Sequence, residues 1–400
     1  MKHVNATLLT IIALLAALAP FATDVYLPTF PAMAAQLGTS ATGVQVTLTA
    51  FLIGAGAGQL VFGPLSDRVG RRKPLIVGCA VCVVAGLAAT LAPDLPTLVA
   101  ARAVQGLSGS AGMVIGRAII ADVAQGSEAA RAFNLTSIVL GVAPVAAPLL
   151  GAVLAQPLGW RGLLGIVTGL SVVTLAVVVL FVPETRRPAA HPLKRPAAGR
   201  RSGLGSGLYL GNMLTLVFGF GAAMAYISAS PFVYQVMIGM NELVYGVVFG
   251  LTALMITAVS FLSARLAGRI RTHVLLRVGV GILVAAGVAL VRLAFSPWPT
   301  WWLVVPLVAG IPAMGLVFGN ATALALGAVP DRAGAASALL GAAQFLLGAA
   351  VAPLVSVQGD HSAQPMALTF AACAGLALVA YLAARNAHVQ RRASLAEPTA

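Results

Sequence analysis

The sequence contains many runs of about twenty residues that have few or no charged side chains. The first runs from Val4 to Thr23, and about twenty apolar residues in an α-helix suffice to cross the hydrocarbon core of a bilayer. Only 8% of the 400 residues are charged, whereas 60% are hydrophobic. A soluble protein of this length needs more charge on its surface. The sequence therefore predicts an all-α integral membrane protein.

Twelve apolar runs are long enough to be predicted as membrane-spanning helices. Their ranges are 6–27, 43–63, 74–92, 96–121, 132–155 and 160–182 in the first half, and 207–229, 244–265, 273–293, 299–327, 334–356 and 365–385 in the second. Residues 184–205, between the halves, are rich in Arg, Lys and Pro, which is typical of a linker. We expect two six-helix bundles, at residues 1–183 and 206–386, and a cytoplasmic tail at 387–400.

The positions of the basic residues indicate an orientation. The formal net charge is +14, but Lys and Arg gather in short segments between apolar runs, as they do in cytoplasmic loops. With the N-terminus inside, 19 of the 24 Lys and Arg residues fall on the cytoplasmic side. We predict a multi-pass monomer in the lipid bilayer of the bacterial inner membrane, with both termini in the cytoplasm and no nucleic-acid partner.

Motifs for catalysis and metal binding are missing from the sequence. There is no phosphate-binding loop of the form G-x-x-x-x-G-K-[ST], so no built-in ATPase is expected. Cys79 and Cys82 form a C-x-x-C, but no second pair or histidine completes a metal site. We expect no enzyme activity, no metal site and no cofactor.

Two charged residues of opposite sign lie inside predicted spans, at similar depth. Asp24 falls in the outer third of the first span, and Arg102 lies one to two turns from the outer end of the fourth. An ionisable group in lipid is expensive and usually functional. Burial favours the neutral form of a carboxyl group, whereas a nearby guanidinium favours the charged form. A pair that opens and closes can therefore load and release a proton. We predict this coupling role for Asp24 and Arg102; the alternative is a structural ion pair.

Uncharged polar side chains in or beside the spans are candidates for a substrate site. A polar group at membrane depth faces the protein interior or a cavity, and a few such groups on an apolar surface are typical of a small-molecule pocket. Helix–helix hydrogen bonds are the alternative for each of them. The predicted pocket residues are Tyr26, Gln45, Gln105, Tyr226, Ser230, Asn320 and Gln344.

Residues 63–73, between the second and third spans, carry the pattern G-x-x-x-D-R-x-G-R-R. Its glycines allow tight turns and close helix approach. Its charged side chains can pair with one another and with an aspartate at the inner end of the fourth span, which would latch the helices in one state. The predicted cytoplasmic gate consists of Gly63, Asp67, Arg68, Gly70, Arg71 and Asp122. The alternative is a solvated loop.

The fifth span contains Gly141, Pro144, Pro148 and Gly151. Each proline removes a hydrogen bond within the helix, and the glycines let a neighbouring helix come close. A bent, closely packed helix suits a bundle interface that rocks or seals. A static kink is the alternative.

These patterns resemble those of a known family. Residues 63–73 are similar to the loop signature of the major facilitator superfamily, residues 98–112 resemble its helix-4 motif R-x-x-Q-G, and residues 141–151 resemble its antiporter helix-5 motif. T-D-V-Y-L-P at 23–28, S-A-S-P-F-V-Y-Q at 228–235 and A-S-A-L-L-G-A-A-Q-F at 336–345 are similar to the Bcr/CflA drug-resistance transporters. The resemblance implies two six-helix bundles and alternating access around a central cavity. The family's proton-coupling acid and arginine map onto Asp24 and Arg102.

The expected function is export of a small antibiotic in exchange for protons, with the proton as coupling ion. The resemblance suggests chloramphenicol-like amphenicols first, with bicyclomycin, sulfonamides or a physiological metabolite as alternatives. Some relatives carry a second acid about two turns earlier, where this chain has Leu15, Ala16 and Ala17. That departure argues against cationic drugs. A ligand-sensing receptor without transport is the alternative of a different class.

Overall fold

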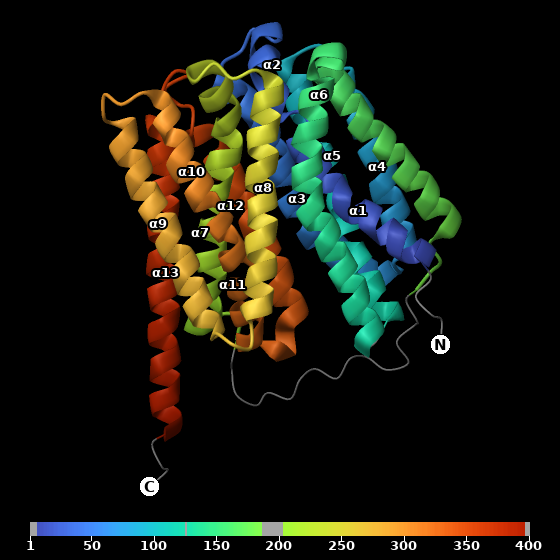
Figure 1. Cartoon of the computed structure of the whole chain (residues 1–400). Helices are drawn as coiled ribbons and strands as arrows, with labels where there is room; N and C mark the ends of the chain where they lie inside the picture. Colours follow the sequence, from blue (N-terminus) through green and yellow to red (C-terminus); the bar gives the residue numbers. More distant parts are fainter. Residues whose placement is uncertain (1–5, 125, 186–202, 397–400) are drawn as a thin grey trace. The chain divides into compact units, whose positions relative to one another are not determined.

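The computed structural model describes residues 6–124, 126–185 and 203–396. Helices make up nearly all of this part of the chain, and no β-strand forms within these ranges (Figure 1). The predicted all-helical fold is therefore confirmed. Most of the predicted linker lies outside the described residues.

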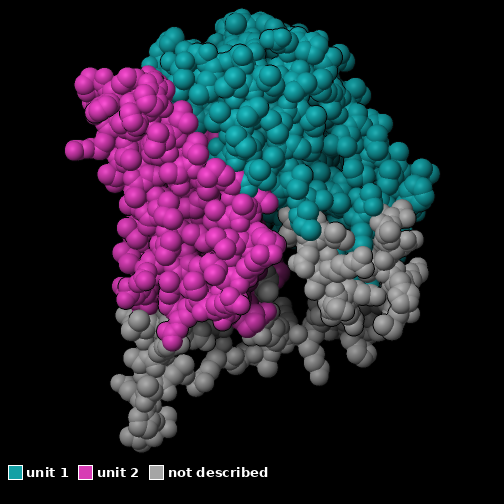
Figure 2. Space-filling model, in the orientation of Figure 1, with its two compact units in different colours: residues 1–188, 227–254, 348–363 teal, residues 189–226, 255–347, 364–400 magenta. Residues whose placement is uncertain are grey.

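The chain divides into two compact units, which Figure 2 shows in different colours. Unit 1 comprises residues 1–188, 227–254 and 348–363, and unit 2 comprises residues 189–226, 255–347 and 364–400. The units differ from the two sequence halves, because two segments of the second half pack with the first half. The two six-helix bundles stay a prediction.

Unit 1 contains the helices of the first half. These are α1 (Ala6–Asp24), η1 (Leu27–Thr29), α2 (Phe30–Gln36), α3 (Ala41–Val69), α4 (Arg72–Thr90), α5 (Leu95–Val123) and α6 (Gly126–Phe181). The N-termini of α3 and α5 are capped: the Ser40 side chain accepts a hydrogen bond from the Gly43 N–H, and Asp94 Oδ1 accepts one from the Thr97 N–H at 2.9 Å. Helix α1 ends at Asp24, and a separate short turn, η1, begins at Leu27, the residue before Pro28.

Helix α6 is 56 residues long and contains two of the predicted spans. At 1.5 Å per residue it would be about twice as long as a bilayer is thick if it were straight. Gly159 breaks it with a φ of 61°, a conformation that glycine adopts without strain. In Figure 1, α6 consists of two arms that join at one end. Among the described residues, 11 helical stretches are long and apolar enough to cross a membrane, and one of them, Ile138–Phe181, covers most of two of the twelve predicted spans.

The second half forms a similar series of helices. They are α7 (Gly207–Pro231), the π-helical turn η2 (Phe232–Met237), α8 (Glu242–Leu266), α9 (Thr272–Ala294), η3 (Thr300–Leu303), α10 (Val304–Gly310), η4 (Ile311–Ala313), α11 (Met314–Ala328), η5 (Pro330–Arg332), α12 (Ala333–Leu354) and α13 (Gln364–Ala396). Helix α13 continues to Ala396, through the start of the predicted tail at 387.

Two boundaries differ from the sequence prediction in a way that matters for the site. Helix α3 continues to Val69 and α4 begins at Arg72, so the predicted loop at 63–73 is mostly helical. The apolar run ends near Gly63, but the hydrogen-bonded helix needs no apolar side chains to continue beyond the membrane. Only Gly70 and Arg71 lie between the two helices.

Candidate functional site

Asp24 is the last residue of α1 and lies inside the protein. Its exposed fraction is 7%. The helical stretch that contains it continues through η1 and α2 to Gln36. Asp24 therefore lies nearer to the middle of this stretch than the predicted span of 6–27 implied. The predicted span ends before Pro28, because a proline there is expected to end an α-helix. The apolar helical stretch nevertheless continues beyond Pro28.

Arg102 lies two turns into α5 and is completely buried. One Nη atom donates to the carbonyl oxygen of Ala22 at 2.7 Å, and the other donates to Gln105 Oε1 at 2.6 Å. The first Nη also donates to the Tyr26 hydroxyl at 3.3 Å. Within the described residues, no ion pair joins Arg102 to Asp24. The predicted partners are thus on neighbouring elements, but the guanidinium binds neutral acceptors.

Close contacts between α3 and α5 position Arg102. A Cβ atom on Gly106 would lie 2.0 Å from the Phe51 carbonyl oxygen, and one on Gly54 would lie 2.1 Å from the Ala103 carbonyl oxygen. Only glycine permits such backbone approach. As a result, the Phe51 ring lies against Arg102, with 4.5 Å between the ring centroid and Cζ.

A small cavity adjoins this site within unit 1. Ala22, Phe51 and Gln105, which all contact the Arg102 guanidinium, belong to its lining, together with Cys82 and Ser171. The cavity therefore borders the residues that hold the arginine.

Most of the predicted pocket residues are engaged with protein partners in this structure. Asn320 Nδ2 donates to Ser263 Oγ at 2.8 Å, and the hydroxyl groups of Ser230 and Tyr245 are hydrogen bonded to each other. Those that are buried are Tyr26, Gln45, Gln105, Tyr226, Ser230 and Asn320. Gln344 is different: it is half-buried, and its amide makes no hydrogen bond within the described residues. Gln344 is thus the predicted residue that is most accessible to a ligand.

Gln45 joins three helix segments of unit 1. Its Nε2 donates to the Ser228 carbonyl oxygen at 2.8 Å, and its Oε1 accepts from the Ser356 hydroxyl. Thr42, one turn earlier, donates to the Ser356 carbonyl oxygen at 2.8 Å. The Gln45 amide therefore holds α3 against the ends of α7 and α12.

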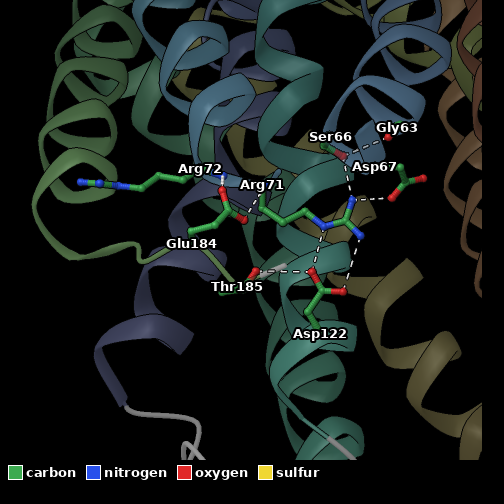
Figure 3. A network of polar contacts seen from close by, with 8 residues as sticks. All are labelled: Gly63, Ser66, Asp67, Arg71, Arg72, Asp122, Glu184 and Thr185. Atoms are coloured by element: carbon green, nitrogen blue, oxygen red, sulfur yellow. Dashed lines mark hydrogen bonds and ion pairs between the residues drawn. The ribbon is translucent and has the colours of Figure 1, made fainter. Parts of the chain in front are cut away.

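The predicted gate residues meet around Arg71, as Figure 3 shows. Arg71 Nε donates to Asp122 Oδ2 at 2.8 Å, and Nη1 donates to Asp67 Oδ1 at 2.6 Å. Glu184 accepts from the backbone N–H groups of Arg71 (2.8 Å) and Arg72 (3.1 Å). We call Asp67, Arg71, Asp122 and Glu184 the loop cluster.

The local backbone explains why Arg71 reaches its partners. Gly70 has a φ of +103°, which turns the chain between α3 and α4, and a Cβ there would lie 2.6 Å from Glu184 Oε2. Burial lowers the pKa of Arg71, but hydrogen bonds with Asp122 and Asp67 outweigh this, so its pKa is raised above the ordinary value.

Three residues of the predicted gate lie outside the loop cluster: Gly63, Arg68 and Gly70, of which Gly70 forms the turn beside Glu184. Arg68 is exposed and makes no ion pair with any described residue. A Cβ on Gly63 would meet Val114 only at 3.8 Å, an ordinary contact. The close helix approach expected at Gly63 is therefore not found, because the tight α3–α5 contacts lie earlier in α3, at Gly54 and Gly58.

The predicted antiporter helix packs next to Asp24. A Cβ on Gly151 would lie 1.8 Å from the carbonyl oxygen of Val25, the residue after Asp24. On another side, Gly246 of α8 faces Pro148 and Ala152, where an added Cβ would come within 2.4 Å of the Ala152 Cβ. Pro144 and Gly141 are half-buried. The non-helical torsion angles in α6 are those of Gly159, so neither Pro144 nor Pro148 breaks the helix.

Sequence reasoning missed two residues of these clusters. Glu184 lies in the segment predicted as the linker, although an acid after an apolar run is a possible partner for the basic segment at 71–73. Phe51 had no distinguishing signal, because one aromatic residue in an apolar helix resembles any other core residue.

Comparison with known proteins shows which family this chain belongs to. Residues 12–353 match the model of the Major Facilitator Superfamily. The chain is 35% identical to the uncharacterized MFS-type transporter YdgK of Bacillus subtilis (89% of this chain, 90% of that protein). It is 28% identical to the bicyclomycin resistance protein homolog of Haemophilus influenzae (94% and 96%). It is 32% identical to a chloramphenicol resistance protein of Pseudomonas aeruginosa (68% and 65%).

The fold is also similar to that of solved structures. A D-xylose-proton symporter matches with a TM-score of 0.77 and 16% identity, over 94% of this chain and 96% of that chain. At this identity, the likeness concerns the fold alone.

Proposed function

Because the chain belongs to the major facilitator superfamily, we propose that it is a proton-coupled antiporter that exports a small antibiotic. The family consists of membrane transporters and not of enzymes. The proposal goes further in three respects: the coupling ion, the direction of transport and the class of substrate.

One observation carries the proposal of proton coupling. A carboxyl group, that of Asp24, is 93% shielded from solvent in an apolar helical stretch, with a fully buried guanidinium on the neighbouring α5. A charge in such a place is expensive, so a carboxyl group there is neutral unless a cation reaches it. Arg102 is bonded to the carbonyl oxygen two residues before Asp24. Ionisation of Asp24 would leave two buried charges of opposite sign on neighbouring elements, which favours a movement that brings them together.

The proposed cycle uses this movement. With Asp24 protonated, Arg102 keeps its neutral acceptors, as it does in this structure. When the site faces the cytoplasm, Asp24 loses its proton and attracts the guanidinium. Proton entry at about 100 mV releases about 2.3 kcal/mol before any pH gradient is counted. For one proton per neutral drug, this supports an accumulation of roughly fifty-fold.

The direction rests on the distribution of charge and on the relatives. The excess of Lys and Arg in alternate connections supports cytoplasmic termini. Relatives carry names that refer to bicyclomycin and chloramphenicol resistance. The inner membrane is the proposed location, and the monomer is the proposed state.

For the substrate, we propose a neutral, polar molecule of modest size, with amphenicols first. The chain has one acid, Asp24, in the first helical stretch and no second acid upstream that would bind a cation. Gln344 offers a free amide on an otherwise apolar helix, which suits hydrogen bonding to an uncharged drug.

Drug susceptibility tests this proposal. The chloramphenicol minimum inhibitory concentration is measured in a pump-deficient bacterial host that expresses the wild type, Asp24→Asn or Asp24→Glu. We expect the wild type to raise it several-fold, Asp24→Asn to abolish this increase, and Asp24→Glu to retain part of it. Membrane levels of each variant are measured by immunoblot.

Two results would contradict parts of the proposal. No increase with a well-expressed wild type would exclude amphenicols, while bicyclomycin and sulfonamides are measured in the same host. Full resistance with Asp24→Asn would remove Asp24 from proton coupling.

A further inference from the structure

We propose that Phe51 and Tyr26 are positioning residues that hold the Arg102 guanidinium on their ring faces while Asp24 carries its proton. This inference rests on the proposed function and deepens it, because it identifies the groups that bind the Arg102 guanidinium while Asp24 is protonated. It concerns aromatic residues on two separate elements, Phe51 on α3 and Tyr26 in the turn after α1.

The geometry points to both rings. Arg102 Cζ lies 4.5 Å from the centroid of the Phe51 ring and 4.8 Å from that of Tyr26. Both distances are within the range of about 6 Å in which a cation is attracted to a ring face. The attraction is strongest where water is excluded, and Arg102, Tyr26 and Phe51 are all buried.

The other partners of Arg102 do not supply a negative charge. They are the Ala22 carbonyl, the Gln105 side chain and the Tyr26 hydroxyl. Nε has no hydrogen-bond partner among the described residues. A buried cation without a counter-ion is strongly disfavoured. The two ring faces, with their negative quadrupoles, therefore supply part of the missing stabilisation.

The position of Phe51 is fixed by backbone contacts and not by its ring. The Phe51 carbonyl oxygen lies where a side chain on Gly106, one turn after Arg102, would be. Tyr26 is held from the opposite end, because its hydroxyl is hydrogen bonded to Thr47 at 3.3 Å. Both rings are thus pre-positioned and need no rearrangement to receive the guanidinium.

Ionisation of Asp24 is the event that would draw Arg102 away. The other titratable or charged groups of the helices packed on α5 in the described chain are Tyr26, Asp67, Arg68, Arg72, Lys73, Cys79, Cys82 and Arg161, and α5 itself adds Arg117 and Asp122. The charges among them lie at helix ends or fifteen or more residues along α5, and phenols and thiols are ordinarily neutral below pH 8. Asp24 is left as the carboxyl group at the end of the helix that Arg102 binds, and its charge is the one that the proposed function changes.

A series of fluorinated phenylalanines at position 51 tests the inference without a substrate. Each fluorine weakens the negative face of the ring and leaves its shape nearly unchanged. Mono-, di- and trifluorophenylalanine are introduced at position 51 of the full chain, and the thermal unfolding temperature of the purified protein in detergent is measured at pH 5 to 8. The same series at Phe62, a buried ring of the same helix in an apolar cluster, is the packing control.

We expect the unfolding temperature to fall in proportion to the number of fluorines at position 51, by about 2 °C for three. The decrease should disappear in Arg102→Gln, where no cation meets the ring. It should be largest at low pH in the wild type, and independent of pH in Asp24→Asn, which mimics the protonated acid. At position 62 the series should have no such trend.

The inference is overturned if the series at position 51 is flat, or if its slope is the same in Arg102→Gln as in the wild type. A slope that does not depend on pH in the wild type would also overturn it, because the rings would then hold Arg102 in both states. None of these measurements involves transport. The unfolding measurements can therefore be interpreted even if drug export fails. Drug export can likewise be interpreted if the unfolding measurements overturn this inference.

Discussion

At the scale of single residues, the site is defined by a buried cation that is surrounded by neutral groups. Arg102 binds the α1 segment through the Ala22 carbonyl oxygen, which belongs to the last turn of the helix. Carbonyl groups in the last turn lack partners within the helix, and the negative end of the helix dipole favours a cation. Arg102 therefore stabilises the end of α1 next to Asp24. A protonated Asp24 is compatible with this arrangement, because Arg102 binds the Ala22 carbonyl oxygen and not the Asp24 carboxyl group.

Gly106 provides a test of how this site is held. We expect Gly106→Ala to destabilise the protein by about 2 kcal/mol, because the added Cβ would lie 2.0 Å from the Phe51 carbonyl oxygen and α3 would have to shift. Gly109→Ala, one turn later on α5, is the matched control, since its nearest contact is Cys82 Sγ at 3.6 Å. Thermal unfolding in detergent distinguishes them. Equal stability of the two variants would contradict the close α3–α5 contact.

The sequence identified Asp24 and Arg102 because charges are rare in apolar runs. It did not identify the partners of Arg102, for a physical reason. Which oxygen a guanidinium reaches depends on where α1 ends and on how α3 and α5 are aligned, and single residues do not encode either. Likewise, Gln45 and Asn320 are polar residues in spans, and only the structure shows that their amides bind neighbouring helices.

At the scale of elements, the loop cluster ties the ends of several helices together. Arg71 lies between α3 and α4, Asp67 is on α3, Asp122 is on α5, and Glu184 follows α6 (Figure 3). Glu184 accepts hydrogen bonds from the backbone N–H groups of Arg71 and Arg72, so it holds the turn itself. The loop cluster therefore joins the ends of α3, α4, α5 and α6.

The two acids that bind Arg71 are expected to differ in importance. The Asp67 side chain is 63% exposed and that of Asp122 is 23% exposed. Water screens the first pair, so Asp67→Asn should change the free energy of unfolding by less than about 1 kcal/mol. Asp122→Asn should destabilise by about 1–2 kcal/mol, because it weakens a charge-assisted hydrogen bond to a buried guanidinium. Chemical or thermal unfolding of both variants measures this, and a larger effect for Asp67→Asn would contradict the account.

The existence of the membrane-spanning helices could be predicted from the length of each apolar run. The residues at which these helices begin and end could not be predicted in this way. Helix α3 continues past its apolar run to Val69, and α1 is interrupted before Pro28 without leaving the apolar region. The break at Gly159 falls in the gap between the predicted spans at 132–155 and 160–182. The π-helical turn η2, at Phe232–Met237, had no signal, because a single extra residue per turn leaves the apolar pattern intact.

At the scale of the whole molecule, the two compact units do not follow the two halves of the chain. Helices α7, α8 and α12 each contribute residues to both units. Contacts such as that between Gln45 and Ser228, which join the two halves of the sequence, lie inside unit 1. If the proposed alternating access is correct, the cycle must break such contacts. The family and the fold follow from motifs that extend over most of the chain, but the substrate does not.

Proton-driven transport by the purified protein tests the central claim most directly. Proteoliposomes that contain the wild type or Asp24→Asn are given a pH gradient, and accumulation of radiolabelled chloramphenicol, or of the drug to which the wild type confers resistance, is followed. The wild type is predicted to accumulate the drug against its gradient. Asp24→Asn is predicted only to equilibrate it, while still exchanging labelled for unlabelled drug. Accumulation by Asp24→Asn at the wild-type level would contradict the account.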